Sequence, residues 1–285
     1  MTFAATVGFL PLRRRSAIPG LKLTLAVTAL YLGVIVVIPL GTLLVRASSL
    51  GFAGIADIAM QPRIAAALRV SFGVSLLAAF LSAFVGAPIA WALARYRFPA
   101  RRLFDAAIDL PFALPTAVAG IALSTIYAPN GWFGAPLAAL GVNVAFTRLG
   151  ILVAMIFVGF PFVVRTLQPV IAELETELEE ASVTLGASRL MTLRRVIAPP
   201  LIPALLTGMA LAFARGVGEY GSVIFIAGNL IGVTEIAPLL IIEKLEEFDY
   251  AGATAIAAIM LAISFAMLLA INRLQAYART RLGDV

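Results

Sequence analysis

An arginine and a glutamate stand four residues apart inside one of the most apolar stretches of this chain. Arg215 and Glu219 belong to the segment FARGVGEYGSVIFIAGN, and this spacing places both on one face of a helix. Charges in apolar surroundings normally face a cavity or each other. Two interpretations are open. Either Arg215 adds positive potential to a path for anions while Glu219 keeps that path from becoming a trap, or the two side chains form an ion pair that fixes helix packing.

A second polar group interrupts an apolar stretch earlier in the chain. The segment DLPFALPTAVAG contains Asp109, Pro111 and Pro115. Proline has no backbone N–H and breaks the hydrogen-bond ladder of a helix, so the freed carbonyls need protein or water as partners. The segment is expected either to line a path through the protein or to form a packing kink. Gly218 belongs to a series of glycines for which close helix packing is favoured over a gating hinge.

The chain contains neither cysteine nor histidine. The first absence excludes a disulfide framework and a thiolate metal site, and the second removes the commonest general base and transition-metal ligand. Clustered catalytic carboxylates are missing as well, which disfavours a membrane enzyme. We therefore expect no catalytic residue, metal site or cofactor in this chain. The net charge of +6 is explained by membrane orientation rather than by nucleic acid.

The composition indicates a membrane protein. Of 285 residues, 62% are hydrophobic and 13% are charged, and the mean hydropathy is +1.04, whereas soluble domains have about 45–50% apolar and about 25% charged residues. Six stretches approach the ~20 residues that span a bilayer, which predicts an all-α bundle of six transmembrane helices. They cover about 23–45, 70–94, 106–127, 149–164, 201–227 and 251–271. The proline at Phe160-Pro161-Phe162 is expected to end or kink the fourth span.

Most of the 21 basic residues fall on one side of such a bundle. Cytoplasmic loops carry an excess of lysine and arginine, so both termini are predicted to be cytoplasmic. The chain then divides into an N-terminal segment (1–22), a transmembrane domain (23–272) and a cytoplasmic tail (273–285). The cytoplasmic clusters are Arg13, Arg14, Arg15 and Lys22; Arg95, Arg97, Arg101 and Arg102; Arg165, Arg189, Arg194 and Arg195; Arg273, Arg279 and Arg281. Outside or at the outer boundary lie Arg46, Arg63, Arg69, Arg148 and Lys244.

Two external loops are expected. Segment 229–250 is acidic, and its part from 236 to 248 could form a short amphipathic helix at the membrane surface or remain a solvated loop. Segment 128–148 is rich in turn-forming Pro, Gly and Asn. Its Trp132 and Phe133 fit an aromatic interfacial anchor.

The longest polar stretch runs from 173 to 200, and we call it the polar insert. Its first part, ELETELEEASVTL, has one apolar and one acidic face at helical spacing. Gly186 permits a left-handed turn, and Ser188 can cap a second, basic helix. Two short helices meeting at a glycine predict a docking site for another protein. The alternative is that this amphipathic helix-turn-helix only lies on the membrane surface. The prolines expected to restart the chain into the next span are Pro199, Pro200 and Pro203.

The polar insert resembles the cytoplasmic loop of permeases of binding-protein-dependent ABC importers. The family motif is E-A-A, three residues, G, nine residues and I-x-L-P, and this chain matches it with small or apolar exchanges at Ser182, Val196 and Ala198. In that family the loop is a coupling helix that sits in a groove of the ATPase subunit. The resemblance implies the same role here for Glu180, Ala181, Ser182, Gly186, Ala187 and Pro199.

Longer strings narrow the resemblance to the sulfate/thiosulfate permeases, and among them to the T-type subunit of a two-permease system. These strings include ALPTAVAGIAL, GFPFVVRTLQPVI, GEYGSVIFIAGN and KLEEFDYAGATAIA. The resemblance implies the fold of a type I ABC importer permease and a bacterial inner-membrane location. It implies as partners a second, W-type permease, two ATP-binding subunits, a periplasmic sulfate-binding protein and membrane lipid. ATP and Mg²⁺ would bind the ATPase, and this sequence has no G-x-x-x-x-G-K-[ST] phosphate loop.

Two other functions remain open from the sequence. One is a permease for another oxyanion such as molybdate. The other is a self-contained secondary anion transporter, which needs no ATPase and carries energy-coupling carboxylates within its spans. The candidates for the translocation path are Arg215, Glu219, Asp109, Pro111, Pro115 and Gly218.

Overall fold

The computed structural model describes residues 20–282, with side chains to residue 277. That part of the chain is built from helices and contains no strand, so the all-α prediction is confirmed. Nearly all of the predicted N-terminal segment lies outside the described residues. The α-helices are α1 (Leu21–Leu32), α2 (Ile38–Ser49), α3 (Gly51–Met60), α4 (Pro62–Arg95), α5 (Arg101–Ile108), α6 (Leu110–Ala113), α7 (Thr116–Tyr127), α8 (Gly134–Ala139), α9 (Arg148–Glu173), α10 (Thr176–Thr184), α11 (Arg189–Thr192), α12 (Ala198–Val217), α13 (Gly221–Ile226), α14 (Ala237–Glu246) and α15 (Tyr250–Leu282). Two π-helical turns, η1 (Gly33–Val37) and η2 (Leu193–Ile197), join α1 to α2 and α11 to α12.

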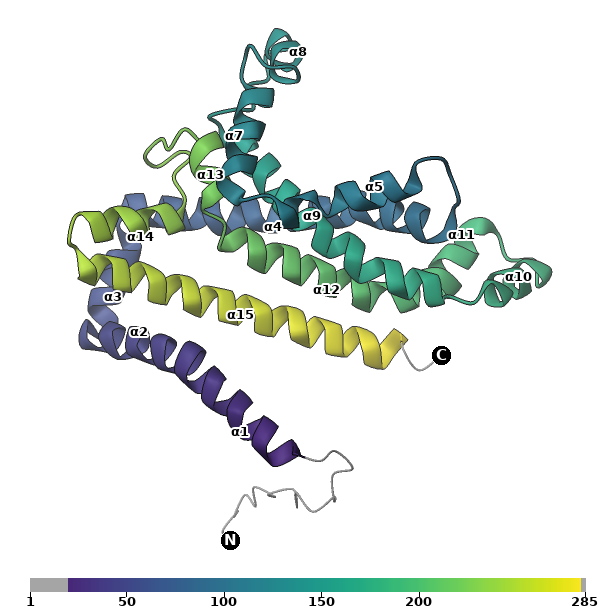
Figure 1. Cartoon of the computed structure of the whole chain (residues 1–285), viewed down its shortest axis with the longest axis horizontal. Coiled ribbons are helices and arrows are strands. Elements are labelled where there is room, and N and C mark those ends of the chain that lie inside the picture. The colour runs from purple at the N-terminus through teal and green to yellow at the C-terminus, as the bar shows by residue number, and fades with distance from the viewer. Residues whose placement is uncertain (1–19, 283–285) are drawn as a thin grey trace.

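Helices α4, α9 and α12 pack against one another and form the centre of the molecule. Their contact is filled by small and aliphatic side chains together with the buried Phe213. Gly208 of α12 lies so close to α9 that a Cβ atom added to it would stand 2.8 Å from the Cα of Val163. This is the close helix packing that the glycine series favours. α15 lies beside α12 and α14 and runs along the bundle (Figure 1).

α1, η1 and α2 form one apolar helix of 29 residues at the edge of the molecule. Ala47 is its one buried residue, and α2 contacts α15. Figure 1 shows this helix apart from the centre. A helix that is apolar on all sides and exposed in a single chain is expected to lie in lipid or against another subunit.

Within the described residues, five helices are long and apolar enough to cross a membrane. The predicted span 106–127 is not one helix but three, α5, α6 and α7. The chain turns at Asp109 and again at Leu114, whose backbone is extended (φ −86°, ψ 136°) because a following proline disfavours the helical conformation. α7 alone, with 12 residues, reaches about 18 Å and cannot cross a core of about 30 Å.

Four other predicted boundaries are wrong. The span 201–227 is interrupted at 218–220, where α12 ends and α13 begins as a separate short helix. The fourth span, predicted to end near 164, continues as α9 to Glu173, so of the two effects expected of Pro161 the end of the helix is excluded; proline is tolerated in a packed membrane helix where neighbours satisfy the freed backbone. Arg165 therefore lies inside a helix rather than in a loop. α4 begins at Pro62 rather than at residue 70, and α15 continues through most of the predicted tail.

The long helices give the molecule two ends. α10 and α11 lie at one end, which we call the insert end, and α3 and α14 lie at the other, the α14 end (Figure 1). α7 and α8 project from the side. α14 confirms the short helix expected within 236–248, and it packs on α4 and α15 with Leu239 and Leu240 buried.

Candidate functional site

The polar insert folds as two short helices joined by a tight turn. Gly186 has a φ of 81°, which lies in the left-handed region. Its N–H donates to the carbonyl of Val183 (2.9 Å), and the N–H of Ala187 donates to that of Ser182 (3.0 Å), the Schellman pattern that closes a helix. A Cβ atom at residue 186 would meet no atom within 4 Å, so the need for glycine is conformational. The predicted glycine turn is confirmed.

The second helix of the polar insert begins at Ser188, whose hydroxyl accepts a hydrogen bond from the N–H of Met191 (3.3 Å). This confirms the predicted cap. α11 then continues through η2 into α12, so the prediction that the prolines restart the chain is wrong. A proline ring clashes with the carbonyl four residues before it, and the wider π turn stands just ahead of Pro199 and Pro200. The insert is thus continuous with a core helix.

Ser182 and Thr192 connect the two short helices of the polar insert. Their hydroxyl oxygens lie 2.8 Å apart. Ser182 donates its own hydrogen to the carbonyl of Glu179 (2.7 Å), so Thr192 is the donor to Ser182. Because Thr192 is buried, an alanine at position 182 would leave its hydroxyl without this acceptor. Ser182, which replaces the second alanine of the family motif, therefore forms a hydrogen bond to Thr192 that an alanine could not form.

Arg95, the last residue of α4, ties the polar insert to the core. Its Nη2 donates to the carbonyl of Leu174 (3.0 Å) and to Oε1 of Glu179 (2.7 Å). The guanidinium also lies over the ring of Trp91, 5.3 Å from its centroid. Since Leu174 links α9 to α10, all three core helices meet the polar insert.

The outer surface of the polar insert exposes apolar side chains. Leu185 is 88% exposed, and a hollow of about 520 Å³ between the two helices is lined in part by Glu180 and Arg189. Exposed apolar surface of this kind marks an interaction site. The other exposed apolar residues are Leu178, Val183, Leu190, Met191 and Leu193. Of the coupling candidates, Glu180, Ala181 and Gly186 are exposed, whereas Ser182, Ala187 and Pro199 are half-buried.

Arg215 and Glu219 form an ion pair at the end of α12. Nη1 of Arg215 lies 2.5 Å from Oε2 of Glu219, whose side chain is 1% exposed. The other carboxylate oxygen accepts hydrogen bonds from the N–H and the hydroxyl of Ser222, both at 2.8 Å. Glu219 therefore also holds the first turn of α13. Gly218, at the C-terminal end of α12, is exposed, and a Cβ atom added to it would meet the carbonyl oxygen of Ala214 at an ordinary contact distance of 3.9 Å.

Asp109 lies in a different cluster, on the face of α9. Nε and Nη2 of Arg165 donate to the two carboxylate oxygens of Asp109 (2.8 and 2.6 Å), a bidentate pair. Nη1 of Arg165 also donates to Asp105 (2.7 Å) and to Gln168 (2.6 Å). The hydrogen bond that Gln168 donates, followed by the Arg165 contacts, holds the pKa of Asp105 below its ordinary value. Arg165 thus fastens the broken segment α5–α6 to the core.

The two proline positions border different surroundings. Pro111 lines an apolar hollow of about 530 Å³ between α4, α5 and α9. Pro115 precedes α7, which packs closely on α13: a Cβ atom on Gly120 would stand 2.4 Å from the carbonyl oxygen of Ser222. α7 therefore lies beside α13, whose first turn Glu219 holds. Asp109, in contrast, pairs with Arg165 of α9.

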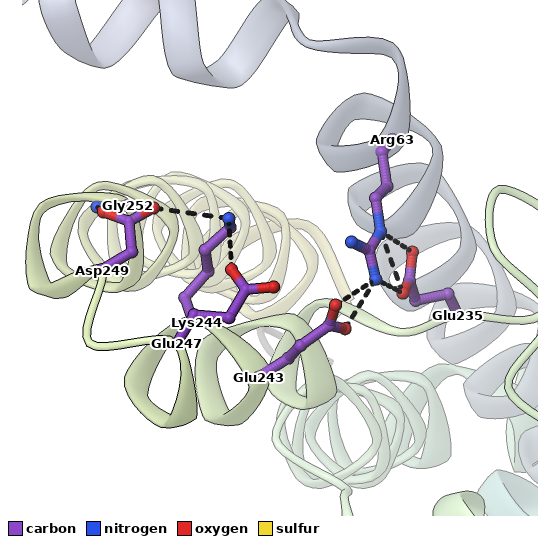
Figure 2. Close-up of polar contacts among 7 residues, drawn as sticks. All are labelled: Arg63, Glu235, Glu243, Lys244, Glu247, Asp249 and Gly252. Atoms are coloured by element: carbon purple, nitrogen blue, oxygen red, sulfur yellow. Dashed lines mark hydrogen bonds and ion pairs between the residues drawn. The ribbon is translucent and has the colours of Figure 1, made fainter.

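A third cluster, at the α14 end, was not predicted as a site. Arg63 at the start of α4 contacts Glu235 through Nε (3.0 Å) and Nη2 (2.6 Å), and Nη2 also contacts Glu243 (2.6 Å), as Figure 2 shows. The Glu235 side chain is fully buried. In the neighbouring turn, the N–H of Gly252 (2.8 Å) and then Lys244 hold the pKa of Asp249 below its ordinary value. These contacts fasten α14 to α4 and α15.

A family model described as "binding-protein-dependent transport system inner membrane component" matches residues 86–283. The chain belongs to this family. Its match includes the whole polar insert. Among the described residues, no group of three or more potential His, Cys, Asp or Glu ligands could hold a metal ion.

Several relatives of this permease cover nearly the whole chain. A probable sulfate transport system permease protein cysT of Nephroselmis olivacea is 52% identical over 258 residues, covering 90% of this chain and 91% of that protein. The sulfate transport system permease protein CysT of Salmonella typhimurium is 47% identical, covering 92% and 94%. A solved bacterial ABC transporter that imports alginate aligns with a TM-score of 0.74 at 15% identity, covering 90% of this chain and 95% of that chain. That likeness shows the fold of an ABC importer permease.

Several polar contacts of this permease that sequence reasoning missed join residues that are distant in sequence. Arg95 and Glu179 are 84 residues apart, and Arg63 and Glu235 are 172 apart. Local periodicity carries no signal for such pairs. The one available hint is that a charged residue within or beside an apolar span needs a partner.

Proposed function

We propose that this chain is the transmembrane permease subunit of an ATP-driven importer that moves sulfate or thiosulfate into the cytoplasm. The observation that carries the proposal is the identity of 45–52% to proteins named sulfate transport permeases, together with an exposed apolar surface on the polar insert. The family membership supports a transport role, and the relatives' names support the substrate.

The importer would contain this chain, a homologous W-type permease, two ATP-binding subunits and a periplasmic sulfate-binding protein. ATP and Mg²⁺ would be bound by the ATPase subunits, so that this chain catalyses no reaction itself. The polar insert would dock in the ATPase through Leu185 and its apolar neighbours, with Glu180 and Arg189 beside them in the hollow. This arrangement requires both termini in the cytoplasm of a bacterial inner membrane.

The contacts of the polar insert suggest how ATP would drive transport. Closure of the ATPase dimer would push the polar insert, and the insert is continuous with α12 and fastened to α4 by Arg95. The core helices would then rock as a unit and open the outer side, and hydrolysis would reverse the motion. Selection of the oxyanion would be made by the binding protein, so this chain needs only a path without strong binding.

Reconstitution tests this function. Vesicles containing the two permeases and the ATPase are loaded with ATP and given labelled sulfate, with or without the binding protein. We expect sulfate uptake only when ATP, the binding protein and this subunit are all present. Uptake by this chain alone would identify a secondary transporter. A preference for molybdate over sulfate would identify a permease for that oxyanion.

A further inference from the structure

A small hollow opens at the α14 end of the core, apart from the sites described above. It lies between the first turns of α4, the start of α9 and the loop after α13, and its volume is about 390 Å³. Two arginines line it, Arg69 and Arg148, and both are exposed. Its other lining residues are small or aliphatic, among them Ala66, Gly73 and Gly232. We call it the two-arginine hollow.

The two arginines differ from the other arginines of the core helices in having no carboxylate partner. Within α4, α9 and α12, Arg63, Arg95, Arg165 and Arg215 each form an ion pair. Neither Arg69 nor Arg148 does so in the part of the chain that the structure describes. No carboxylate among the described residues therefore neutralises the positive charge of the two-arginine hollow.

Each arginine lies near one end of a core helix. Arg69 stands seven residues after the first residue of α4, about 10 Å along a helix of 34 residues. Because such a helix, at about 51 Å, is longer than the ~30 Å core of a bilayer, Arg69 lies at the boundary of the core, where an anion arriving from water would meet it. Arg148 is the first residue of α9, and its Nε donates to the carbonyl of Val233 (2.7 Å), which fixes the side chain and leaves its two terminal nitrogens to face other groups. The positive N-terminal end of the 26-residue helix α9 adds to the same potential.

We propose that the two-arginine hollow receives the doubly charged oxyanion at the outer end of the translocation path. This inference rests on the proposed function. Two guanidinium groups match the charge of the dianion, and their planar N–H forks match its oxygens. Because a water molecule occupies about 30 Å³, the hollow has room for the anion with much of its hydration shell. The anion would be attracted without being tightly bound, so that it could move on.

The test uses the assembled importer with its binding protein in vesicles. Arg69→Gln, Arg148→Gln and the double variant are compared with Arg46→Gln, which removes an exposed arginine of α2 that lies outside the hollow. Sulfate uptake and ATP hydrolysis are measured in the same vesicles. We expect the double variant to move about tenfold less sulfate per ATP, the size of effect that one or two charge-assisted hydrogen bonds give. ATP hydrolysis stimulated by the binding protein should remain, and Arg46→Gln should equal the unmodified importer.

Three results would overturn the inference. If both single variants and the double variant keep the sulfate-to-ATP ratio, the two arginines do not handle the anion, although the importer still transports sulfate. If uptake and stimulated ATP hydrolysis fall in proportion, the arginines serve assembly or docking instead. If the unmodified importer moves no sulfate at all, the proposed function fails and this inference fails with it.

A second measurement reads the potential of the hollow directly. The chain has no cysteine, so Ala66→Cys places one thiol of this subunit in the hollow. We expect an anionic thiol reagent to modify it faster than a cationic reagent of the same size. This preference should fall several-fold when Arg69→Gln is added. Equal rates with both reagents, or a preference unchanged by Arg69→Gln, would contradict the proposal.

Discussion

Glu219 is a buried carboxylate whose contacts place the short helix that follows it. It pairs with Arg215 and accepts two hydrogen bonds from Ser222. We expect Arg215→Gln to lower both the apparent Tm of the detergent-solubilised importer and sulfate uptake, because it leaves the buried Glu219 carboxylate without its charged partner, which costs about 1–3 kcal/mol. Uptake is measured per molecule of inserted protein.

The charge-neutral double variant separates the two interpretations of this pair. Arg215→Gln with Glu219→Gln removes both charges and keeps an acceptor for Ser222. Since the double variant leaves no buried charge without a partner, we expect both the Tm and the uptake to recover. A stable double variant that transports no sulfate would instead assign Arg215 to the anion path.

Ser182 and Thr192 form a neutral contact that a double-mutant cycle can measure. Ser182→Ala leaves the buried Thr192 hydroxyl without its acceptor, which costs about 1–3 kcal/mol and should lower the apparent Tm. Adding Thr192→Val removes the unpaired hydroxyl and should restore most of the loss. The sulfate-to-ATP ratio should stay unchanged, because the family motif itself has alanine at position 182. Strictly additive effects on the Tm would show that the contact contributes nothing.

Gly186 determines how the two helices of the polar insert meet. A β-branched residue is strained at its φ of 81°, by about 1–2 kcal/mol, so Gly186→Val should open the turn and shift α10 relative to α11. We expect ATP hydrolysis to continue with several-fold less sulfate moved per ATP, and membrane insertion to stay normal. Both rates are measured in the same vesicles.

The matched control at this turn is Gly186→Asn. Asparagine visits the left-handed region more readily than other residues with a side chain, and no atom lies within 4 Å of a Cβ at this position. Near-normal coupling with Asn and loss with Val would tie coupling to the backbone conformation. Normal coupling with Val would refute the proposed role of the turn.

The elements that the sequence could predict are those defined by neighbouring residues. The turn at Gly186, the cap at Ser188 and the long apolar helices follow from local composition and spacing. Prolines were less reliable: Pro115 stands at a break, whereas Pro161 lies inside a continuous helix. A proline's effect depends on whether neighbouring helices hold the chain on both sides, and such neighbours are distant in sequence.

The partners of the charged residues could not be predicted for the same reason. Arg165 looks like one of several basic residues near a span end, yet its carboxylate partners lie 56 and 60 residues earlier. Glu235 looks like part of a solvated acidic loop, yet its side chain is fully buried against Arg63. Only the fold brings these charges together. Arg215 and Glu219 were the exception, since four-residue spacing on one helix suffices to predict their contact.

The core helices connect the polar insert to the two-arginine hollow. α4 carries Arg95 at the insert end and Arg69 near the α14 end, and α9 carries the link to α10 at one end and Arg148 at the other. Both helices pack against α12. Because packed helices move as rigid bodies, a push on the polar insert would change the surroundings of both arginines. The same movement of the core helices would then couple ATP hydrolysis at the polar insert to the handling of the anion at the two-arginine hollow.

This connection requires the two ends of the molecule to lie on opposite sides of the membrane. Phe248 and Leu185 are 76% and 88% exposed and stand at the α14 end and the insert end. Since the chain has no cysteine, Phe248→Cys or Leu185→Cys gives this subunit one reactive thiol. We expect a membrane-impermeant thiol reagent to label Phe248→Cys in intact spheroplasts, and to label Leu185→Cys only after permeabilisation. The opposite pattern would place the polar insert outside the cell, where no ATPase subunit could reach it, and would remove the basis for coupling.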